Sequence, residues 1–554
     1  MPSKYHPNLL VIKMASALTG LGFFLFALFL HWHAGTFQGE FGRYQDEGMH
    51  YVTGLMLHDF LLSPAHWTRP MAFAQDYYLH FPKVGLGNWP PLFPLIQAGW
   101  ELMFGVSRVS LLLLMILLNA LLAWCVQQAL RHRVDPWLAA LAGLFTIASP
   151  LSQAQASMVM AEIPLALLTL LALLAFTRWL DSGSTRDALW FGILTTAAIM
   201  TKGNAWVIFL VTPAALLLTG RLRLLLTRGW WLAIAIIAFV CVPYTWYSMR
   251  IVTQGWDTRS FPGFTYLGRS LWTHSIFVVE IIGPILTAIA LGGLIMRLRR
   301  STSFWLVMGL YAIAIVGFHV AVPTSIEARK IYQIVPIIAI FAAAGLDPIA
   351  RRLPIRYAPQ AVALASLLIF VLGTFYFLPP FIPGFGVAVE KVIPRPDSAG
   401  AVILVSSNRF TEDAEAAIIA EWAQRDRTRH TYLARGTKLL SSPAAVNQQL
   451  DYVPVYQSPA ELRTLLDQVP VAYVIVHTAA LRLAQRPYRH HAQLALLLAS
   501  HPEEWQTIHH SERQALGDLH DLIIYRNRRD LRGVPIHFTV DLSRKIGRDL
   551  STNP

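Results

Sequence analysis

Several long stretches of this sequence contain no Asp, Glu, Lys or Arg, and this feature restricts the possible folds more than any other. About 20 consecutive apolar residues are enough to cross the hydrocarbon core of a bilayer as a helix. Runs of this length and composition are typical of transmembrane helices and not of soluble domains. Seven of them occur, at Met14–Trp32, Val109–Leu130, Trp137–Ala161, Gly203–Gly220, Gly229–Met249, Ser301–Ile326 and Tyr357–Val389.

Shorter apolar runs supply further candidate spans, and the two sets together predict about eleven transmembrane helices. Charged residues make up only 14% of the chain, whereas soluble globular proteins contain about 25%. The sequence therefore predicts a polytopic α-helical membrane protein. The shorter runs lie at 163–177, 188–201, 281–296 and 331–346.

The formal net charge of +13 could indicate a nucleic-acid-binding protein, so the positions of the basic residues decide what it means. They cluster in alternate connections between the predicted spans, as expected for the cytoplasmic loops of a membrane protein whose N-terminus is cytoplasmic. Transmembrane topology thus accounts for the positive charge without a nucleic-acid partner. With a cytoplasmic N-terminus, eleven spans place the C-terminal part on the extracytoplasmic side. The basic connections contain Lys4 and Lys13; Arg131 and Arg133; Arg178 and Arg186; Arg221, Arg223 and Arg228; Arg297, Arg299 and Arg300; and Arg351, Arg352 and Arg356.

The first predicted span is followed by a long extracytoplasmic segment, residues 33–108. Its many aromatic residues, and the helical spacing of apolar residues in 47–62, predict helices that lie in the membrane interface. No small-residue cleavage site follows the first apolar run, so we expect a retained span and not a removed signal peptide. The two cysteines, Cys125 and Cys241, lie inside apolar runs and predict no disulfide.

A proline-rich linker at 381–396 separates the predicted transmembrane domain, 1–380, from a soluble extracytoplasmic domain at 397–554. Strand-like and helix-like patterns alternate after the linker, and this alternation predicts a small α/β domain. Strands are expected at 401–406, 471–477 and 521–525, and helices at 411–424 and 489–500.

The extracytoplasmic connections contain few charged residues, and the predicted topology brings these residues to one face. Asp46 and Glu47 follow the first span, Glu162 begins a later span, and Lys202 occupies a tight hairpin. Each has a structural alternative, as solvated loop acids, a helix N-cap or a lysine snorkelling to lipid headgroups. The loop arginines could equally bind lipid phosphates. The other charged residues on this side are Arg250, Arg259, Arg269, Glu327, Arg329 and Lys330.

A carboxylate beside several cations at a membrane surface suits group transfer from a phosphate-linked lipid donor. The carboxylate can accept the proton of an attacking hydroxyl, while Lys and Arg stabilise the departing phosphate. The sequence contains no Asp-x-Asp pair of the kind found in enzymes that use nucleotide sugars, and no GxxxxGK[ST] loop for ATP. Neither nucleotide-sugar use nor ATP coupling is therefore supported.

Five segments resemble, in matching order, the motifs of membrane glycosyltransferases of the GT-C class, in the branch of protein O-mannosyltransferases and aminoarabinose transferases. The resemblance extends over about residues 10–350. RYQDEGMHYVTGLML is similar to the Asp-Glu motif of the family's first loop, and NWPPLFPL to its Lys-Pro-Pro-Leu element. The other three segments are MVMAEIPL, similar to its acid-plus-Pro span start, TKGNAWVIFLVTP, similar to its Ser/Thr-Lys-Gly segment, and EARKIYQIVPIIAI, similar to its Arg-Tyr and Pro span.

The resemblance implies a GT-C-like fold and a role for each matching residue. Asp46 would be the catalytic base, and Glu47 its neighbour in the acceptor site. Glu162 matches a second acidic position, while Lys202 and Arg329 match basic positions near the donor phosphate. The sequence departs from the aminoarabinose branch at Asn88-Trp89, where that branch has Lys before its two prolines. The predicted substrate-binding residues are Tyr51, Asn88, Glu162, Lys202, Arg259, Arg269, Glu327, Arg329 and Lys330.

We therefore expect a glycosyltransferase of the bacterial inner membrane that moves a hexosyl or pentosyl group, with inversion, from a polyprenyl-phosphate carrier. The acceptor is expected to be a lipid, glycan or protein of the cell envelope, on the extracytoplasmic side. The alternative is a flippase for a polyprenyl-linked lipid. Transporters place their polar groups near the bilayer midplane, whereas the candidate residues here lie at span ends on one side, which favours the enzyme.

No cofactor is predicted, apart from a possible divalent metal. The adjacent histidine pairs His490-His491 and His509-His510 lack the spacing of a helical metal-ligand pair. We expect both pairs on the surface of the C-terminal domain and assign no metal site to them.

Overall fold

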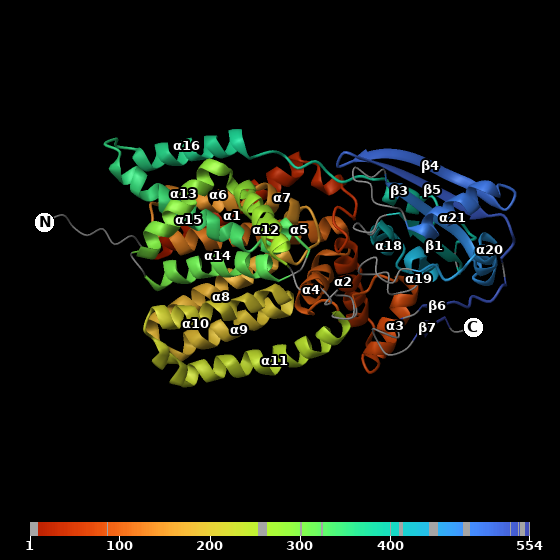
Figure 1. Cartoon of the computed structure of the whole chain (residues 1–554), viewed down its shortest axis with the longest axis horizontal. Helices are drawn as coiled ribbons and strands as arrows, with labels where there is room; N and C mark the ends of the chain where they lie inside the picture. The colour runs from red at the N-terminus through yellow and green to blue at the C-terminus, as the bar shows by residue number, and fades with distance from the viewer. Residues whose placement is uncertain are drawn as a thin grey trace.

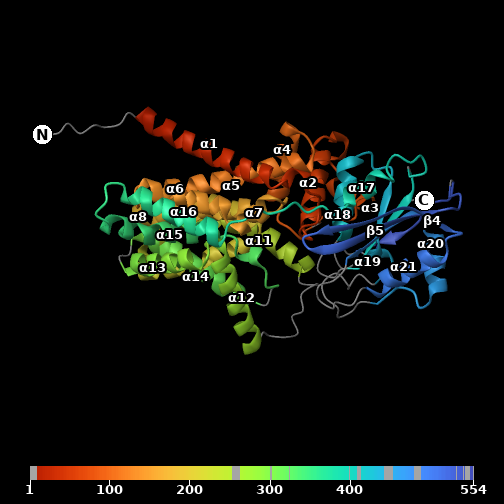
Figure 2. The same ribbon diagram turned by 90° about the horizontal axis from the view of Figure 1, so that it is seen from above.

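The computed structural model describes residues 9–85, 87–252, 263–299, 302–322, 325–398, 400–408, 414–441, 453–479, 488–531, 533–540, 542 and 549–552. A helical bundle and a β-sheet domain lie at opposite ends of the long axis (Figure 1). Seen from above, helix α1 (Leu9–His33) runs along one side of the bundle toward the sheet domain (Figure 2).

The bundle is built from helices whose apolar side chains face either one another or the outside. In α8 (Glu162–Ser182) and α15 (Ile334–Arg352), 78% of the span is buried inside the protein, whereas in α11 (Arg228–Val252) only 17% is buried. Helices that are apolar all round but exposed on one side are suited to contact with lipid. The remaining bundle helices are α5 (Arg108–Leu130), α6 (Pro136–Ala148), α7 (Pro150–Ala156), α9 (Thr185–Thr201), α10 (Ile208–Leu218), α12 (Phe264–Ile282), α13 (Pro284–Arg299), α14 (Ser303–Ala321) and α16 (Ala358–Gly373).

The expectation of a multi-pass helical membrane protein is confirmed, but the count of about eleven spans is corrected. Among the described residues, 6 helices are long and apolar enough to cross a membrane, or up to 8 if each of two bent pairs is one span. The run from Trp137 to Ala161 breaks at Ser149 and Pro150, where α6 and α7 meet at 56°. Helices α9, α10 and α16 are each too short to count by length alone. Uninterrupted apolar composition therefore does not guarantee a continuous helix of spanning length.

The long segment after α1 contains three helices that lie between the bundle and the sheet domain (Figure 1). They are α2 (Glu47–Leu61), in agreement with the helical spacing at 47–62, α3 (Pro70–His80) and α4 (Leu92–Phe104). Helix α2 packs tightly on both sides of its first turns. A Cβ at Gly54 would lie 2.8 Å from the Gln97 side chain of α4, and one at Gly48 would lie 2.4 Å from the carbonyl oxygen of Ala416 in the C-terminal domain. The glycines thus allow α2 to be held from two directions.

The C-terminal domain contains a five-stranded sheet in the order β2-β1-β3-β5-β4. Strands β2 (Tyr432–Arg435) and β3 (Val471–Ala479) lie on either side of β1 (Val402–Ser407) and run parallel to it. Strands β5 (Asp518–Asn527) and β4 (Trp505–Ala515) continue the sheet beyond β3 in antiparallel fashion. The expectation of an α/β domain is confirmed. Its helices include α18 (Ala414–Arg425), α20 (Pro459–Gln468) and α21 (Arg489–Ser500), and a short helix α17 (Phe385–Glu390) precedes the sheet.

The expected surface position of the two histidine pairs is wrong for the first pair. His490 and His491, at the start of α21, are 0% and 3% exposed. The His491 ring lies 3.0 Å from Ser406 Oγ of β1 and 3.2 Å from Thr478 Oγ1 of β3. The first turn of α21 is pressed against the sheet, and hydroxyl groups from two strands satisfy the imidazole. His510 is exposed and His509 half-buried on the edge strand β4. Cys125 and Cys241 are free, as expected.

Candidate active site

One predicted catalytic residue and three predicted substrate-binding residues lie at the ends of four elements that meet beside α2. Asp46 immediately precedes α2, and Glu162 is the first residue of α8. Lys202 follows the last residue of α9, and Arg329 lies in the short 3-10 helix η6 (Ala328–Ile331). Because these elements all begin or end at the side of the bundle that faces the sheet domain, four residues far apart in sequence come together.

These four residues form one buried network of ion pairs. Arg329 Nη2 lies 2.8 Å from Asp46 Oδ2, and Arg329 Nη1 lies 3.4 Å from Glu162 Oε1. The same Glu162 oxygen lies 2.5 Å from Lys202 Nζ. All four side chains are about nine-tenths buried or more. Buried charges are costly unless they are paired, so the network explains how they are accommodated. The prediction that these residues lie near one another agrees with this geometry.

Glu327 extends the network on the other side of Arg329. Glu327 Oε2 lies 2.7 Å from Arg329 Nε and accepts a hydrogen bond from the Tyr44 hydroxyl. The other carboxylate oxygen, Oε1, accepts a hydrogen bond from Ser325 Oγ. Burial alone would raise the pKa of Glu327, but Arg329 and these hydrogen bonds outweigh burial and lower it to about 2. The Arg329 guanidinium lies 3.8 Å from the centre of the Tyr44 ring. Tyr44 belongs to the quoted first-loop motif, yet nothing in its local sequence marked it as a partner of Arg329.

Lys330 follows Arg329 and is half-buried. Burial lowers the pKa of its amine to about 8, with Glu327 acting in the opposite direction. Its backbone carbonyl accepts a hydrogen bond from Asn204 of the Thr-Lys-Gly-Asn hairpin, at 3.3 Å. That contact ties the hairpin carrying Lys202 to η6, so the basic residues of the two segments are held together.

Glu47 points away from the network and into a second buried ion pair. Its carboxylate lies 3.1 Å from Arg108 Nη2, and it accepts hydrogen bonds from the backbone N–H groups of Gly42 and Val159. Arg108 also donates to the carbonyl oxygens of Gly39 and Ser157, at 2.8 and 2.9 Å. Every one of these contacts ties chain segments to one another. An acceptor-binding role for Glu47 stays a prediction, whereas its contacts are those of a residue that holds the loop in shape.

The structure does not bring all the predicted binding residues into the network. Tyr51 is fully buried against Phe41 on another face of α2, with ring centres 4.6 Å apart. Arg250 and Arg269 are exposed on α11 and α12. Asn88 is half-buried, with its side-chain nitrogen 4.0 Å from Met49 Sδ. Arg259 lies outside the described residues.

Comparisons with known proteins find a family model and several solved structures that are similar to this chain. A model of the family described as "Dolichyl-phosphate-mannose-protein mannosyltransferase" matches residues 88–247. The chain is similar to ArnT from Cupriavidus metallidurans in the apo state, at 14% identity and a TM-score of 0.56, over 91% of this chain and 98% of ArnT. The chain has the GT-C glycosyltransferase fold. The resemblance predicted from the five motifs is thereby confirmed.

Two further solved structures share this GT-C fold. One is ArnT from the same organism bound to undecaprenyl phosphate, at 13% identity and a TM-score of 0.57, over 95% of this chain and 100% of ArnT. The other is the archaeal oligosaccharyltransferase AglB from Archaeoglobus fulgidus, in complex with an inhibitory peptide and a dolichol-phosphate. AglB matches at 14% identity and a TM-score of 0.51, over 84% of this chain and 69% of AglB. No curated protein sequence matches.

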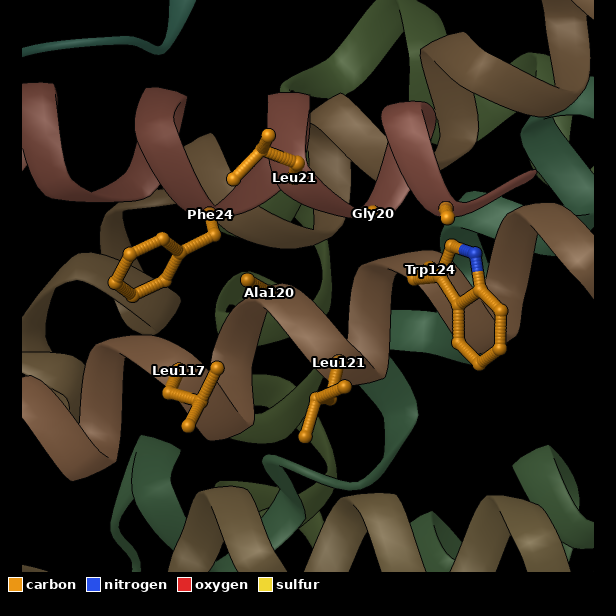
Figure 3. A pocket seen from close by; sticks show the side chains of 8 residues that line it. Gly20, Leu21, Phe24, Leu117, Ala120, Leu121 and Trp124 are labelled. Atoms are coloured by element: carbon orange, nitrogen blue, oxygen red, sulfur yellow. The ribbon is translucent and has the colours of Figure 1, made fainter. Parts of the chain in front are cut away.

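A pocket of about 300 Å³ is lined by none of the network residues (Figure 3). It lies between α1 and α5 and is lined by Ala17, Gly20, Leu21, Phe24, Leu117, Ala120, Leu121 and Trp124. Arg108, beside the network, begins α5, whereas Trp124 lies near its other end. At 1.5 Å per residue the two ends of this stretch are roughly 24 Å apart. The lining is apolar and lies along the middle of α1 and α5.

Among the described residues, one group of side chains could hold a metal ion, and it lies in the C-terminal domain and not in the network. His510, Glu512 and Asp521 have ligand atoms within 4.8 Å of one another on strands β4 and β5. His510 and Glu512 are exposed. Exposed groups of this kind are common on proteins without a metal, so the geometry alone assigns no metal to this protein.

Proposed function

We propose that this protein transfers a sugar from a polyprenyl-phosphate donor to an envelope acceptor on the extracytoplasmic side of the bacterial inner membrane. The observation that carries the proposal is the buried network in which Arg329 pairs with both Asp46 and Glu162 while Lys202 pairs with Glu162. It combines, at one place, a carboxylate that can accept a proton and two cations that can bind a phosphate.

The proposed reaction is a single displacement at the anomeric carbon of the donor sugar. An acceptor hydroxyl attacks this carbon while Asp46 takes the hydroxyl proton, and the bond between the anomeric carbon and the phosphate oxygen breaks. Polyprenyl phosphate leaves with the electron pair of that bond. Lys202 and Arg329 stabilise the charge on the departing phosphate. Because attack and departure occur on opposite sides of the carbon, the configuration inverts.

Arg329 links the two halves of this reaction. Its guanidinium contacts Asp46, Glu162 and Glu327 at 2.8, 3.4 and 2.7 Å. A donor phosphate is a bidentate partner that guanidinium groups bind well, and at this position it would compete with Asp46 for Arg329. Donor binding would thereby free the Asp46 carboxylate for the acceptor hydroxyl. The order of events in this scheme is donor first and acceptor second.

The similar proteins support a polyprenyl-phosphate donor. ArnT has been seen with undecaprenyl phosphate and AglB with a dolichol-phosphate, and the matching family is named for dolichyl-phosphate-mannose. The transferred group is proposed to be a hexosyl or pentosyl residue. The acceptor is proposed to be a lipid, glycan or protein. In the proposed step Lys202 and Arg329 supply positive charge to the phosphate, and activity measured after EDTA treatment tests whether a divalent metal contributes.

The proposed orientation places the network and the sheet domain outside and the arginine-rich helix ends inside. Arg299 is exposed at the end of α13, and Glu512 is exposed on β4. In a background without the native cysteines, Glu512→Cys should react with a membrane-impermeant reagent added to intact spheroplasts, and Arg299→Cys should react only after permeabilisation. The reverse pattern would overturn the orientation.

The deciding experiment incubates purified protein with a panel of polyprenyl-phosphate sugars and an envelope lipid extract, and measures release of polyprenyl phosphate. A glycosyltransferase breaks the sugar-phosphate bond, whereas a flippase moves the intact lipid. Release by the wild-type protein, and its loss in Asp46→Asn, would establish transfer. Movement of intact lipid across proteoliposomes without release would establish the flippase instead.

A further inference from the structure

His50 is a buried polar residue to which the reaction above assigns no task. It lies on α2, four residues after Asp46, so both side chains project from the same face of the chain at the start of that helix. His50 is 1% exposed, and neither of its ring nitrogens has a hydrogen-bond partner among the described residues. Buried polar side chains almost always have at least one partner. An imidazole with two unpartnered nitrogens therefore needs an explanation.

The neighbours of His50 are the charged residues of the ion-pair network. Asp46, Lys202, Glu162 and Arg329 are the charges that act on its ring. The ring also packs on two aromatic residues of the Asn-Trp-Pro-Pro segment and α4, with centres 5.0 Å from Trp89 and 5.3 Å from Phe93. His50 thus lies within electrostatic reach of both the proposed base and the proposed phosphate-binding cations.

Trp89 provides a second unpartnered group on the same wall. Its indole nitrogen is buried without a hydrogen-bond partner, and Lys202 Nζ lies 5.5 Å from the centre of its ring. The backbone carbonyl of Trp89 accepts a hydrogen bond from Tyr244 at 2.5 Å, which fixes the segment in place. Three unpartnered nitrogens, two of His50 and one of Trp89, therefore lie on this wall, in side chains that are themselves packed.

Burial lowers the pKa of His50 to about 4, with Asp46 acting in the opposite direction. The ring is therefore neutral at physiological pH, with one N–H donor and one nitrogen acceptor. Such a group pairs well with a hydroxyl, which can both donate and accept, whereas a phosphate is better served by the neighbouring cations. In the proposed displacement, the transferred sugar must lie between the acceptor hydroxyl at Asp46 and the phosphate at Lys202. This is the position that His50 adjoins.

We propose that His50, assisted by the indole nitrogen of Trp89, is the residue that recognises a hydroxyl group of the transferred sugar. This inference rests on the proposed function, because it assigns His50 to the sugar of the polyprenyl-phosphate donor. It makes His50 a determinant of specificity, and it separates sugar recognition from the phosphate binding of Lys202 and Arg329.

The test compares the affinity of two probes, undecaprenyl phosphate and the undecaprenyl-phosphate sugar that supports the fastest release in the panel above. The ratio of the two affinities isolates the contribution of the sugar. His50→Phe retains ring packing on Trp89 and Phe93 and removes both nitrogens. We expect His50→Phe to bind undecaprenyl phosphate like the wild type and to lose about fivefold or more of the sugar-dependent gain, the amount expected for one lost hydrogen bond.

His31→Phe is the matched control, because His31 is also a buried histidine, at 2% exposure, but lies at the end of α1 and pairs with Thr36. It should leave both affinities unchanged. His50→Leu is the second apolar variant, to be used if His50→Phe does not bind undecaprenyl phosphate. A sugar-dependent gain that survives in whichever His50 variant retains undecaprenyl phosphate binding overturns the inference while leaving the proposed function intact.

Measurements on the wild-type protein distinguish a failure of the proposed function from a failure of the role of His50. If it binds neither probe, the proposed function fails and the role of His50 fails with it. If it binds both probes equally, the donor phosphate is recognised but no sugar site exists, and only the role of His50 is overturned.

Discussion

Two adjacent acids at the start of α2 belong to two buried ion-pair clusters that are built in different ways. Glu47 and Arg108 are held largely by the backbone, through N–H groups of Gly42 and Val159 and a carbonyl of Ser157. Asp46 and Arg329 pair through their side chains, and Arg329 also pairs with the side chains of Glu162 and Glu327. Backbone partners are fixed by the fold, whereas side-chain partners can be exchanged for a substrate. We therefore infer that Glu47 and Arg108 form a structural cluster, which holds the fold, and that Asp46 and Arg329 belong to a chemical cluster, which acts on substrate.

The largest expected effect separates Asp46 from Glu47. Asp46→Asn keeps the shape of the side chain and removes the proton acceptor, and loss of a general base typically costs about 10² to 10⁴ in rate. We expect transfer to collapse while undecaprenyl phosphate still binds, as measured by single-turnover release with matched protein amounts. More than about half of wild-type turnover in Asp46→Asn would remove Asp46 from the chemistry and favour the flippase.

The second prediction concerns stability, for which the ion pair of Glu47 and Arg108 should matter more than Asp46. Arg108→Ala leaves the fully buried Glu47 without its charge partner, and breaking a buried ion pair in this way costs about 3–5 kcal/mol. We expect a marked fall in thermal unfolding temperature in detergent and in membrane yield. Asp46→Asn is the comparison variant and should unfold at nearly the wild-type temperature. Equal unfolding temperatures for wild type and Arg108→Ala would show that this cluster does not hold the fold.

The third prediction tests the cations of the chemical cluster. Lys202→Ala removes one proposed phosphate contact, and Arg329 still pairs with Glu162. A charged hydrogen bond is worth about 1.5–3 kcal/mol, so undecaprenyl phosphate should bind about tenfold more weakly or worse. Arg221→Ala removes an exposed pair with Asp181 elsewhere in the bundle and serves as the control. Unchanged binding in Lys202→Ala would leave only the snorkelling explanation for this lysine.

The smallest expected effect comes from Lys330 and depends on pH. Its lowered pKa of about 8 means that the amine loses its charge as pH rises through that value. If Lys330 assists Arg329 in binding phosphate, affinity for undecaprenyl phosphate should fall by up to about fivefold between pH 7 and pH 9. Lys330→Met should bind with no such pH dependence. A pH profile that is the same in both proteins would exclude Lys330 from donor binding.

The lowered pKa of Lys330 also affects stability. As pH rises, stability should increase, whereas affinity for undecaprenyl phosphate should fall. Between pH 8 and the ordinary lysine value of 10.5, the unfolded chain holds a proton on Lys330 that the folded protein has released. Stability therefore rises with pH across this window. Lys330→Met should remove that rise, which equilibrium unfolding measurements at pH 7 and pH 10 would detect.

Much of the fold could be predicted because its signals are local in sequence. The charge-free runs predict membrane helices, and strand-like and helix-like runs predict the elements at 402–407, 471–479 and 489–500. The bend at Ser149 and Pro150 was missed, since an apolar run has the same composition whether the helix continues or breaks there. Strands β2 and β4 were missed as well. Strand β4 exposes much of its length at a sheet edge and carries no continuous apolar run.

The sequence by itself determined which chemical groups are present at the span ends. The order of its five motifs was also specific enough to indicate a resemblance to the GT-C class. Only the tertiary structure decided their partners. Glu47 pairs with Arg108, 61 residues away, and Arg329 reaches Glu162, 167 residues away. The burial of His490, and that of His50 with its two unpartnered nitrogens, likewise depends on which surfaces pack on their helices. Periodicity and propensity act within a few residues of the chain, whereas ion pairing and burial are set by the packing of elements that are distant in sequence.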